Sequence, residues 1–208
     1  MEESRLKRLP PIFDFDAKKR ETAGIIAGID EAGRGCLAGD VFAAAVVLNA
    51  KAVIDGLDDS KKLTPKARDR LYGEITANSI AYAVASATAE EIEELNILGA
   101  ALLAMERAFD KISESVAVNL ALIDGNKTPE LGVAAEAVIG GDGKSASIAA
   151  ASVLAKVSRD RYALELDKAY PAYQFAKHKG YGTKLHYEMI GKYGVCPAHR
   201  KSFLKKIP

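Results

Sequence analysis

Apolar and polar positions along the chain alternate in blocks that have the lengths of strands and helices. Residues 25–29 and 41–48 are apolar runs of strand length, and the glycine-rich turn between them predicts two neighbouring antiparallel strands. Three more segments, 80–88, 116–123 and 135–139, have the apolar content and length of strands. The pattern therefore predicts strands at five places along the chain.

Two helices are marked by residues that favour helix ends. Residues 63–78 predict a helix with Thr64 as its N-cap and Pro65 at its first helical position. Residues 145–170 predict a long alanine-rich helix that stops before Pro171, because proline cannot continue a helix interior.

A third helix is indicated by periodicity alone. Residues 89–112 carry apolar side chains at helical spacing, at Ile92, Leu95, Leu98, Leu102, Met105 and Phe109. We interpret this stripe as core. Residues 178–194 predict a loop that leads into a short helix. The order of these elements is typical of one α/β layer domain with a helical C-terminal extension.

Composition bounds the class of protein. The 208 residues can bury a sizeable core as one domain. Residues 1–23 are charged and interrupted by Pro10 and Pro11, so we interpret them as an N-terminal extension without the apolar core of an export signal. No apolar run reaches the roughly 18 residues that a membrane span needs. Cys36 and Cys196 lack a CxxC spacing, and we expect a reduced, cytoplasmic protein.

The small net charge of +1 hides an asymmetry along the chain. Residues 156–208 hold 12 Lys and Arg against 4 Asp and Glu, together with all three histidines. The rest holds 17 basic and 24 acidic side chains. This distribution favours a polyanion-binding surface beside a metal-binding one. Two solvated faces of opposite sign remain the alternative.

Carboxylates follow the predicted strands where glycine begins a turn. Asp30 and Glu31 end the first run, Asp124 ends another, and a third run reaches Asp142 through two glycines. If the strand that ends at Asp30 and the strand that ends at Asp124 are parallel neighbours, their acids meet at the carboxyl edge of the sheet. Asp30 and Glu31 converge only if the strand stops there, since successive strand residues face opposite sides.

Grouped acids repel one another unless a cation balances them, and oxygen ligands suit Mg²⁺ or Mn²⁺ better than zinc. For any single acid, a turn residue or helix N-cap is the competing interpretation. The spacing alone indicates a carboxylate metal site of unknown chemistry.

Several motifs together resemble the ribonuclease HII family over residues 24–203. They are GIDEAGRGCLAGDVFAAAVVL, DSKKLT, ELNILGA, LIDGN, GGDGKSASIAAASVLAKVSRDR and YPAYQFAKHKGYGTKLHYEMI with GVCPAHRKSF, in the order that the family shows them. The resemblance implies a ribonuclease H-like fold, with a mixed five-stranded sheet flanked by helices. It places a catalytic domain over residues 24–208, including a basic helical region at about 171–208.

The resemblance also implies an activity. The family's enzymes hydrolyse the RNA strand of RNA–DNA hybrids and nick 5′ of single ribonucleotides in duplex DNA, leaving 5′-phosphate and 3′-hydroxyl ends. The implied ligands of two Mg²⁺ or Mn²⁺ ions are Asp30, Glu31, Asp124 and Asp142. Two such ions can activate water without a histidine or cysteine nucleophile.

Substrate contacts are implied by the same resemblance. A glycine-arginine-glycine turn at Gly33, Arg34 and Gly35 exposes backbone groups suited to the 2′-hydroxyl, and Tyr181 can stack at the ribonucleotide junction. Cys36 departs from the proline that usually follows this turn in the family, which predicts a looser turn. The expected substrates are RNA–DNA hybrid and DNA that contains ribonucleotides, bound by a monomer without a membrane partner.

Basic residues near Tyr181 are expected to contact phosphates: Lys179, Lys184, His186 and also His178. Lys61 is balanced between phosphate contact and a solvated loop, whereas Lys62 is assigned to the loop, as is the neighbouring Ser60. Asp160 is assigned to an internal ion pair within its helix rather than to a fifth ligand. His199 and Arg200 either contact phosphate or only anchor the tail.

Two competing functions can be stated. Ribonuclease HIII is a related family whose members carry a sizeable N-terminal substrate-binding domain and lack the arginine between the two glycines. Here about 23 residues precede the first predicted strand and the arginine is present. A catalytically inert hybrid-binding module would not need four acids. Cleavage that depends on metal separates an enzyme from such a module.

Overall fold

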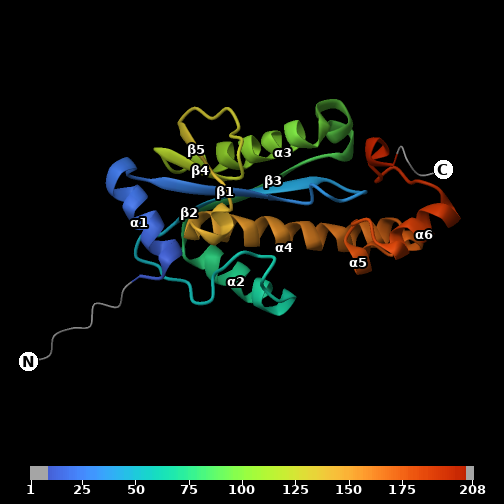
Figure 1. Ribbon diagram of the computed structural model, residues 1–208, viewed down its shortest axis with the longest axis horizontal. Coiled ribbons are helices and arrows are strands. Elements are labelled where there is room, and N and C mark those ends of the chain that lie inside the picture. The colour runs from blue at the N-terminus through green and yellow to red at the C-terminus, as the bar shows by residue number, and fades with distance from the viewer. Residues whose placement is uncertain (1–8, 205–208) are drawn as a thin grey trace, which may run out of the picture.

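The computed structural model describes residues 9–204, so the first eight residues of the N-terminal extension and the last four of the basic C-terminal region lie outside it. A mixed five-stranded sheet of order β3-β2-β1-β4-β5 forms the centre (Figure 1). Its strands are β1 (Ile26–Ala32), β2 (Val41–Leu48), β3 (Ser79–Ala87), β4 (Leu120–Asp124) and β5 (Ala134–Val138). β1 pairs antiparallel with β2 and parallel with β4, which confirms the predicted mixed sheet.

Helices cover both faces of the sheet. They are α1 (Pro11–Ala23), α2 (Pro65–Ala77), α3 (Ala89–Ser113), α4 (Ala146–Ala169), α5 (Phe175–His178) and α6 (Lys184–Tyr193), with single 3₁₀ turns η1 (Gly141–Gly143), η2 (Pro171–Tyr173) and η3 (Lys201–Phe203). α3 lies on one face, α1, α2 and α4 on the other, and α5 and α6 lie beyond the end of α4 (Figure 1). Among residues 9–204, no helix is both long and apolar enough to cross a membrane.

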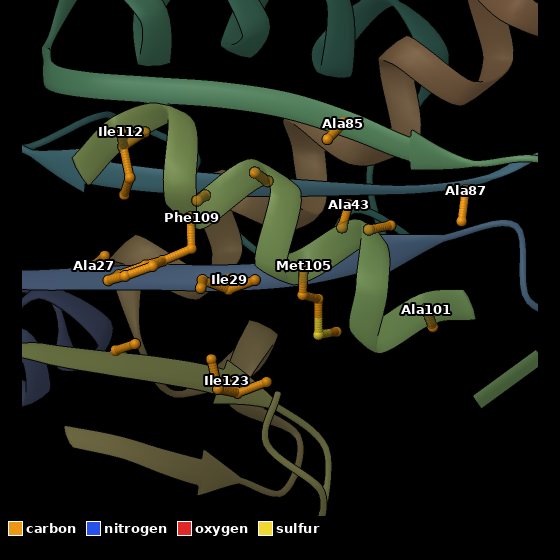
Figure 2. Close-up of a cluster of buried hydrophobic side chains, with 14 of the residues drawn as sticks. Ala27, Ile29, Ala43, Ala85, Ala87, Ala101, Met105, Phe109, Ile112 and Ile123 are labelled. Carbon is orange, nitrogen blue, oxygen red and sulfur yellow. The ribbon is translucent and has the colours of Figure 1, made fainter. Parts of the chain in front are cut away.

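The face under α3 is packed by large apolar side chains of α3 set among alanines of the strands and the helix. Met105 and Phe109 point from α3 onto β1, where Ala27 and Ile29 are fully buried (Figure 2). Burying one such large side chain contributes about 1.5–3 kcal/mol relative to exposure. The predicted core role of Met105 and Phe109 is therefore confirmed.

On the other face, α4 packs very closely against the sheet. Alanines of α4 lie against the sheet, and the first turn of α4 comes so close to β1 at Gly28 that no side chain fits between them. A Cβ added at Gly28 would lie 2.1 Å from the backbone carbon of Ser147. The small residues of the predicted alanine-rich helix thus bring α4 into direct contact with the sheet.

The predicted helix over residues 89–112 is broken at Asn96. Asn96 has φ 59° and ψ 171°, and its side-chain oxygen accepts from the N–H groups of Leu98 and Gly99 at 2.9 and 3.3 Å. Asn96 therefore caps the start of a second helical segment. The kink leaves Leu95 and Leu98 exposed, so the prediction of an unbroken buried stripe is wrong at these two positions.

Other boundaries follow the predicted signals closely. Thr64 caps α2 by accepting from the N–H of Ala67 at 3.2 Å. β4 begins at Leu120, four residues later than the apolar run suggested, because residues 116–119 form no strand pairing. α1 was not predicted at all. Pro11 occupies its first turn, where a missing N–H costs nothing.

Candidate active site

Three carboxylates converge at one edge of the sheet. β1 and β4 run parallel with Ile29 beside Ile123, which sets the next residues, Asp30 and Asp124, side by side. Asp142 lies on η1, after β5. Oxygen atoms of Asp30, Asp124 and Asp142 all lie within 4.8 Å of one another. The predicted meeting of these three acids is thus present.

The group gathers negative charge that its protein surroundings balance only in part, through the ion pair of Lys61 with Asp142. Burial raises the pKa of Asp30 well above its usual value, and the nearby charges of Glu31 and Asp124 raise it further. A hydrogen bond with Ser152 and one from the backbone N–H of Glu31, at 2.7 Å, lower the pKa only in part. Three oxygen donors that repel one another fit a hard divalent cation such as Mg²⁺ or Mn²⁺.

Glu31 does not belong to the three-acid group. The expectation that β1 ends at Asp30 is wrong: β1 continues to Ala32, so Glu31 faces the other side of the sheet from Asp30. Its carboxylate accepts from Arg34 Nη1 at 3.2 Å. Burial raises the pKa of Glu31, and Arg34 opposes the rise. Glu31 and Asp124 nevertheless line one small hollow.

The loop before α2 approaches the acids through Lys61. Lys61 Nζ lies 3.2 Å from Asp142 and is largely exposed. Burial alone would lower its pKa, but the hydrogen bond and charge of Asp142 raise it overall. Ser60 is buried and bonds Ser152 at 2.8 Å, so it supports the acids rather than a solvated loop. Lys62 pairs with Asp58 at 3.0 Å, as expected for a loop residue.

The glycine-arginine-glycine turn is held by a buried arginine. Arg200 Nη1 donates to the carbonyls of Gly33, Arg34 and Cys36 at 2.8, 3.0 and 2.9 Å. Gly33 has φ +97°, a conformation that favours glycine. Of the two expectations for Arg200, the structure supports anchoring, because its side chain is fully buried. Burial lowers the pKa of Arg200 to about 10.

Cys36 closes this turn. Its backbone N–H donates to Gly33 at 3.2 Å, a bond that proline could not form. The side chain is buried and, like that of Cys196, its thiol is free. The expected loosening of the turn is not observed.

Tyr181 lies beside the turn, although it is far away in sequence. Cys36 and Tyr181 form an isolated antiparallel bridge, and the N–H of Leu37 donates to Gly180 at 2.8 Å. The ring of Tyr181 is 38% exposed, and Lys156 Nζ lies 5.3 Å from its centroid. The turn, whose backbone could bind a sugar hydroxyl, and Tyr181, whose ring could stack on a sugar or base, are thus adjacent.

The three histidines are buried inside the fold and do not face solvent. His186 is fully buried, and its ring bonds the carbonyl of Tyr181 at 3.0 Å and His199 at 3.2 Å. His178 is also buried, stacks on His186 and bonds the carbonyl of Tyr173 at 2.8 Å. The predicted phosphate contacts of His186 and His178 are therefore wrong, because their nitrogens are used inside the fold.

The lysines remain at the surface. Lys184 is 92% exposed in its side chain, and Lys179 is half-buried. Asp160 accepts from Lys156 at 2.7 Å and lies 3.8 Å from Arg68, which supports its assignment to an ion pair. A cleft of 510 Å³ opens beside Tyr181, lined by the cations Arg68, Lys156, Arg161, Lys177 and Lys179.

Sequence reasoning missed three supporting residues. Ser152 bonds Asp30 from within α4, and Arg159 donates to the carbonyls of Asp40 and Ala38 at 3.0 and 2.8 Å. Asp16, which belongs to α1, is fully buried against the start of α4. In the sequence, an ionisable side chain on an otherwise apolar face of a predicted helix could have indicated such a residue. Of these three residues, only Arg159 shows that pattern.

Known proteins resemble this chain along nearly its whole length. The family model described as ribonuclease HII matches residues 27–206. Ribonuclease HII of Caldicellulosiruptor bescii is 56% identical over 204 residues, which cover 98% of each chain. The crystal structure of ribonuclease H2 from Pyrococcus horikoshii is 26% identical, with a TM-score of 0.67 over 85% of this chain and 92% of that one.

Fold alone does not separate the two candidate families. Bst-RNase HIII, solved in complex with Mn²⁺, has a TM-score of 0.64 at 17% identity over 86% of this chain and 64% of that one. Sequence does separate them, because the matching family model and the highly identical relative are both ribonuclease HII. The chain therefore belongs to the ribonuclease HII family and is a ribonuclease H, a hydrolase that cleaves nucleic acid.

Proposed function

We propose that the chain hydrolyses the RNA strand of RNA–DNA hybrids and nicks 5′ of single ribonucleotides embedded in duplex DNA. The products are 5′-phosphate and 3′-hydroxyl ends. The observation that carries this proposal is the convergence of Asp30, Asp124 and Asp142 next to the turn at Gly33, Arg34 and Gly35. An acidic site beside exposed backbone donors suits cleavage next to a 2′-hydroxyl.

The acids hold the metal in this proposal. Asp30, Asp124 and Asp142 provide the central oxygens, and Glu31 joins from the neighbouring hollow. Two Mg²⁺ or Mn²⁺ ions held by these residues would supply an activated water and stabilisation of the leaving 3′-oxygen. The Mn²⁺ complex of Bst-RNase HIII, which shares the fold, supports this choice of metal. Lys61 lowers the repulsion at Asp142 from the solvent side.

The turn recognises the 2′-hydroxyl through its N–H groups. Arg200 already engages the carbonyls of Gly33 and Arg34, which orients the peptide planes. Within residues 9–204, no acceptor meets the N–H groups of Arg34 and Gly35, and both residues are exposed. Two fixed donors can bind the oxygen of a ribose hydroxyl that DNA lacks.

Tyr181 stacks at the junction, and the cleft beside it binds the backbone. The cations of that cleft contact phosphates, which supply most of the affinity for nucleic acid. The backbone bridge to Cys36 keeps the ring at a fixed place relative to the turn. A single ribonucleotide is thus read at two adjoining points.

The test uses a duplex with one ribonucleotide and a long RNA–DNA hybrid, each with and without Mg²⁺. We expect cleavage that needs the metal, 5′ of the ribonucleotide. Tyr181→Ala should lose about ten- to a hundredfold on the single ribonucleotide, since stacking contributes roughly 1–3 kcal/mol per base. It should lose less on the hybrid, where many 2′-hydroxyls are available, and Tyr181→Phe should stay nearer to wild type. Equal losses on both substrates would contradict the role of Tyr181 at the junction. Binding of the substrates without cleavage would instead indicate a catalytically inert hybrid-binding module.

A further inference from the structure

Asp142 is supported differently from the other two acids. Asp30 and Asp124 lie on paired strands, whereas Asp142 lies on the single turn η1, between β5 and α4. Within this turn, Gly141 donates to Asp124 at 2.7 Å, and the N–H of Ser145 donates to Gly141 at 2.8 Å. The position of Asp142 therefore depends on where α4 begins.

The start of α4 is held by the carboxylate of Asp16 in α1. Asp16 is 0% exposed, and its two oxygens accept from Ser145 Oγ at 2.6 Å, Ser147 N at 2.8 Å and Ser147 Oγ at 2.6 Å. A negative charge at a helix N-terminus is favourable because the free N–H groups there carry partial positive charge. Arg20, at 3.8 Å, is the nearest cation that pairs with it.

α1 also grips the strand on the other side of Asp142. Lys19 Nζ lies 2.6 and 2.7 Å from the two carboxylate oxygens of Glu136, which belongs to β5. From the opposite side, β1 presses on the start of α4 at Gly28, where no side chain intervenes. The segment that carries Asp142 is thus fixed at both of its ends by one helix.

We propose that Asp16 is a positioning residue for the acidic site, acting through Ser145 and Ser147 on the placement of Asp142. The proposal rests on the proposed function, because it assumes that the acids bind metal. Asp16 itself lies outside the three-acid group and is fully buried. Its effect is transmitted by the hydrogen bonds that join α1 to the start of α4.

The experiment measures binding of Mn²⁺ alone to the full chain, from the free Mn²⁺ signal in electron paramagnetic resonance. Asp16→Asn keeps the size of the side chain but places an amide donor against the donors of Ser145 and Ser147. We expect Mn²⁺ affinity to fall about tenfold, the size reported for supports of metal ligands in general. With saturating substrate, the Mn²⁺ concentration for half-maximal cleavage should rise by the same factor.

Two control variants separate positioning from stability. Asp14→Asn makes the same chemical change on α1, where Asp14 is exposed and pairs with Lys18. Leu71→Ala removes a fully buried side chain of α2 from the core beneath α4 and lowers stability without changing a hydrogen bond of Asp16. Both should bind Mn²⁺ as wild type does, at a temperature where every variant is folded. If Asp16→Asn fails to fold, Ser147→Ala removes one donor to Asp16 and should weaken Mn²⁺ binding in the same direction.

The outcomes distinguish the two proposals. If Asp30→Asn leaves Mn²⁺ binding intact, the metal site itself is wrong and the proposed function fails. If Asp30→Asn abolishes binding but Asp16→Asn, or Ser147→Ala where Asp16→Asn does not fold, binds like Leu71→Ala, the role of Asp16 is purely structural and this inference is overturned. Weaker binding by the Asp16 variant than by both controls supports it.

Discussion

Two polar clusters lie on either side of the glycine-arginine-glycine turn, and they are built in opposite ways. The acidic site places like charges together, and burial and repulsion both raise the pKa of Asp30. The cluster behind the turn holds His178, His186, His199 and Arg200, and most of their nitrogens bond to the protein itself. Like charges gathered in a fold mark a place for a counter-ion, whereas polar side chains that bond chiefly to backbone groups of the protein mark a scaffold.

The sharpest way to break this comparison is to remove one charge from each cluster. Asp30→Asn and Asp124→Asn should each lower metal-dependent cleavage by at least about a thousandfold, which corresponds to roughly 4 kcal/mol of transition-state stabilisation. Stability should stay the same or rise for Asp30→Asn, because a carboxylate with a raised pKa is buried at a cost.

Asp110→Asn on the exposed side of α3 is the matched control and should change neither quantity. Rates on a hybrid and urea unfolding in EDTA give both readouts. Near-normal cleavage by either acid variant contradicts the assignment at that position. Glu31→Gln, measured beside them, decides whether the carboxylate outside the three-acid group belongs to the site.

Removing the charge of Arg200 should have the opposite signature. Arg200→Met leaves the carbonyls of Gly33, Arg34 and Cys36 without a donor, and each buried acceptor left unpaired costs about 1–3 kcal/mol. We expect the free energy of unfolding to fall by at least about 3 kcal/mol. Lys201→Met, at the exposed neighbouring residue, is the control. A variant of Arg200 as stable as that control would remove the scaffold interpretation of this cluster.

The same contrast explains what the sequence could predict. The acids follow strands and glycines in the chain, so a local pattern placed Asp30 and Asp124, and strand pairing did the rest. Arg200 depends on contacts with a turn 167 residues away in sequence, and His186 depends on the packing of the C-terminal region around its ring. No local pattern distinguishes a buried histidine from one that faces a phosphate, so charge counting placed His186 at the surface and left Arg200 open between phosphate contact and anchoring.

Two helices show the same limit at the level of the fold. α4 was predicted because alanines and Pro171 mark its course within the chain. α1 was missed because the consecutive prolines favoured a break, and its reason for being ordered, the bonds of Asp16 to the start of α4, lies 129 residues away. The kink of α3 depends on the capping side chain of Asn96, which a periodicity argument does not consider.

The two clusters should change the free energy of unfolding in opposite directions as pH falls. Burial, chiefly, lowers the pKa of His186 to about 4, so its contribution is present above the unfolded pKa of about 6.5 and is lost as pH falls towards 4. This loss reaches up to about 3 kcal/mol. The raised pKa of Asp30 acts the other way, because the folded chain binds a proton that the unfolded chain releases, which adds stability as pH falls.

Urea unfolding in EDTA between pH 7 and 5 tests this pair of slopes. Asp30→Asn should steepen the loss of stability on acidification, and His186→Asn should flatten it while keeping a donor to the carbonyl of Tyr181. Parallel profiles for the two variants and wild type would show that neither group titrates as its surroundings predict.

The smallest expected effect concerns the lysines that stay outside both clusters. Lys184 is exposed and Lys179 is half-buried beside Tyr181, so they are free to contact phosphates where the histidines are not. Hybrid affinity should fall with salt at a slope of about −0.9 for each phosphate neutralised. Lys179→Gln with Lys184→Gln should flatten that slope by about 1.8 without moving the cleaved bond. Lys18→Gln with Lys168→Gln removes two exposed lysines elsewhere and is the matched control, to be measured by fluorescence anisotropy across a salt series. If both double variants keep the wild-type slope, Lys179 and Lys184 belong to a solvated face, and the backbone is bound by the remaining cations of the cleft.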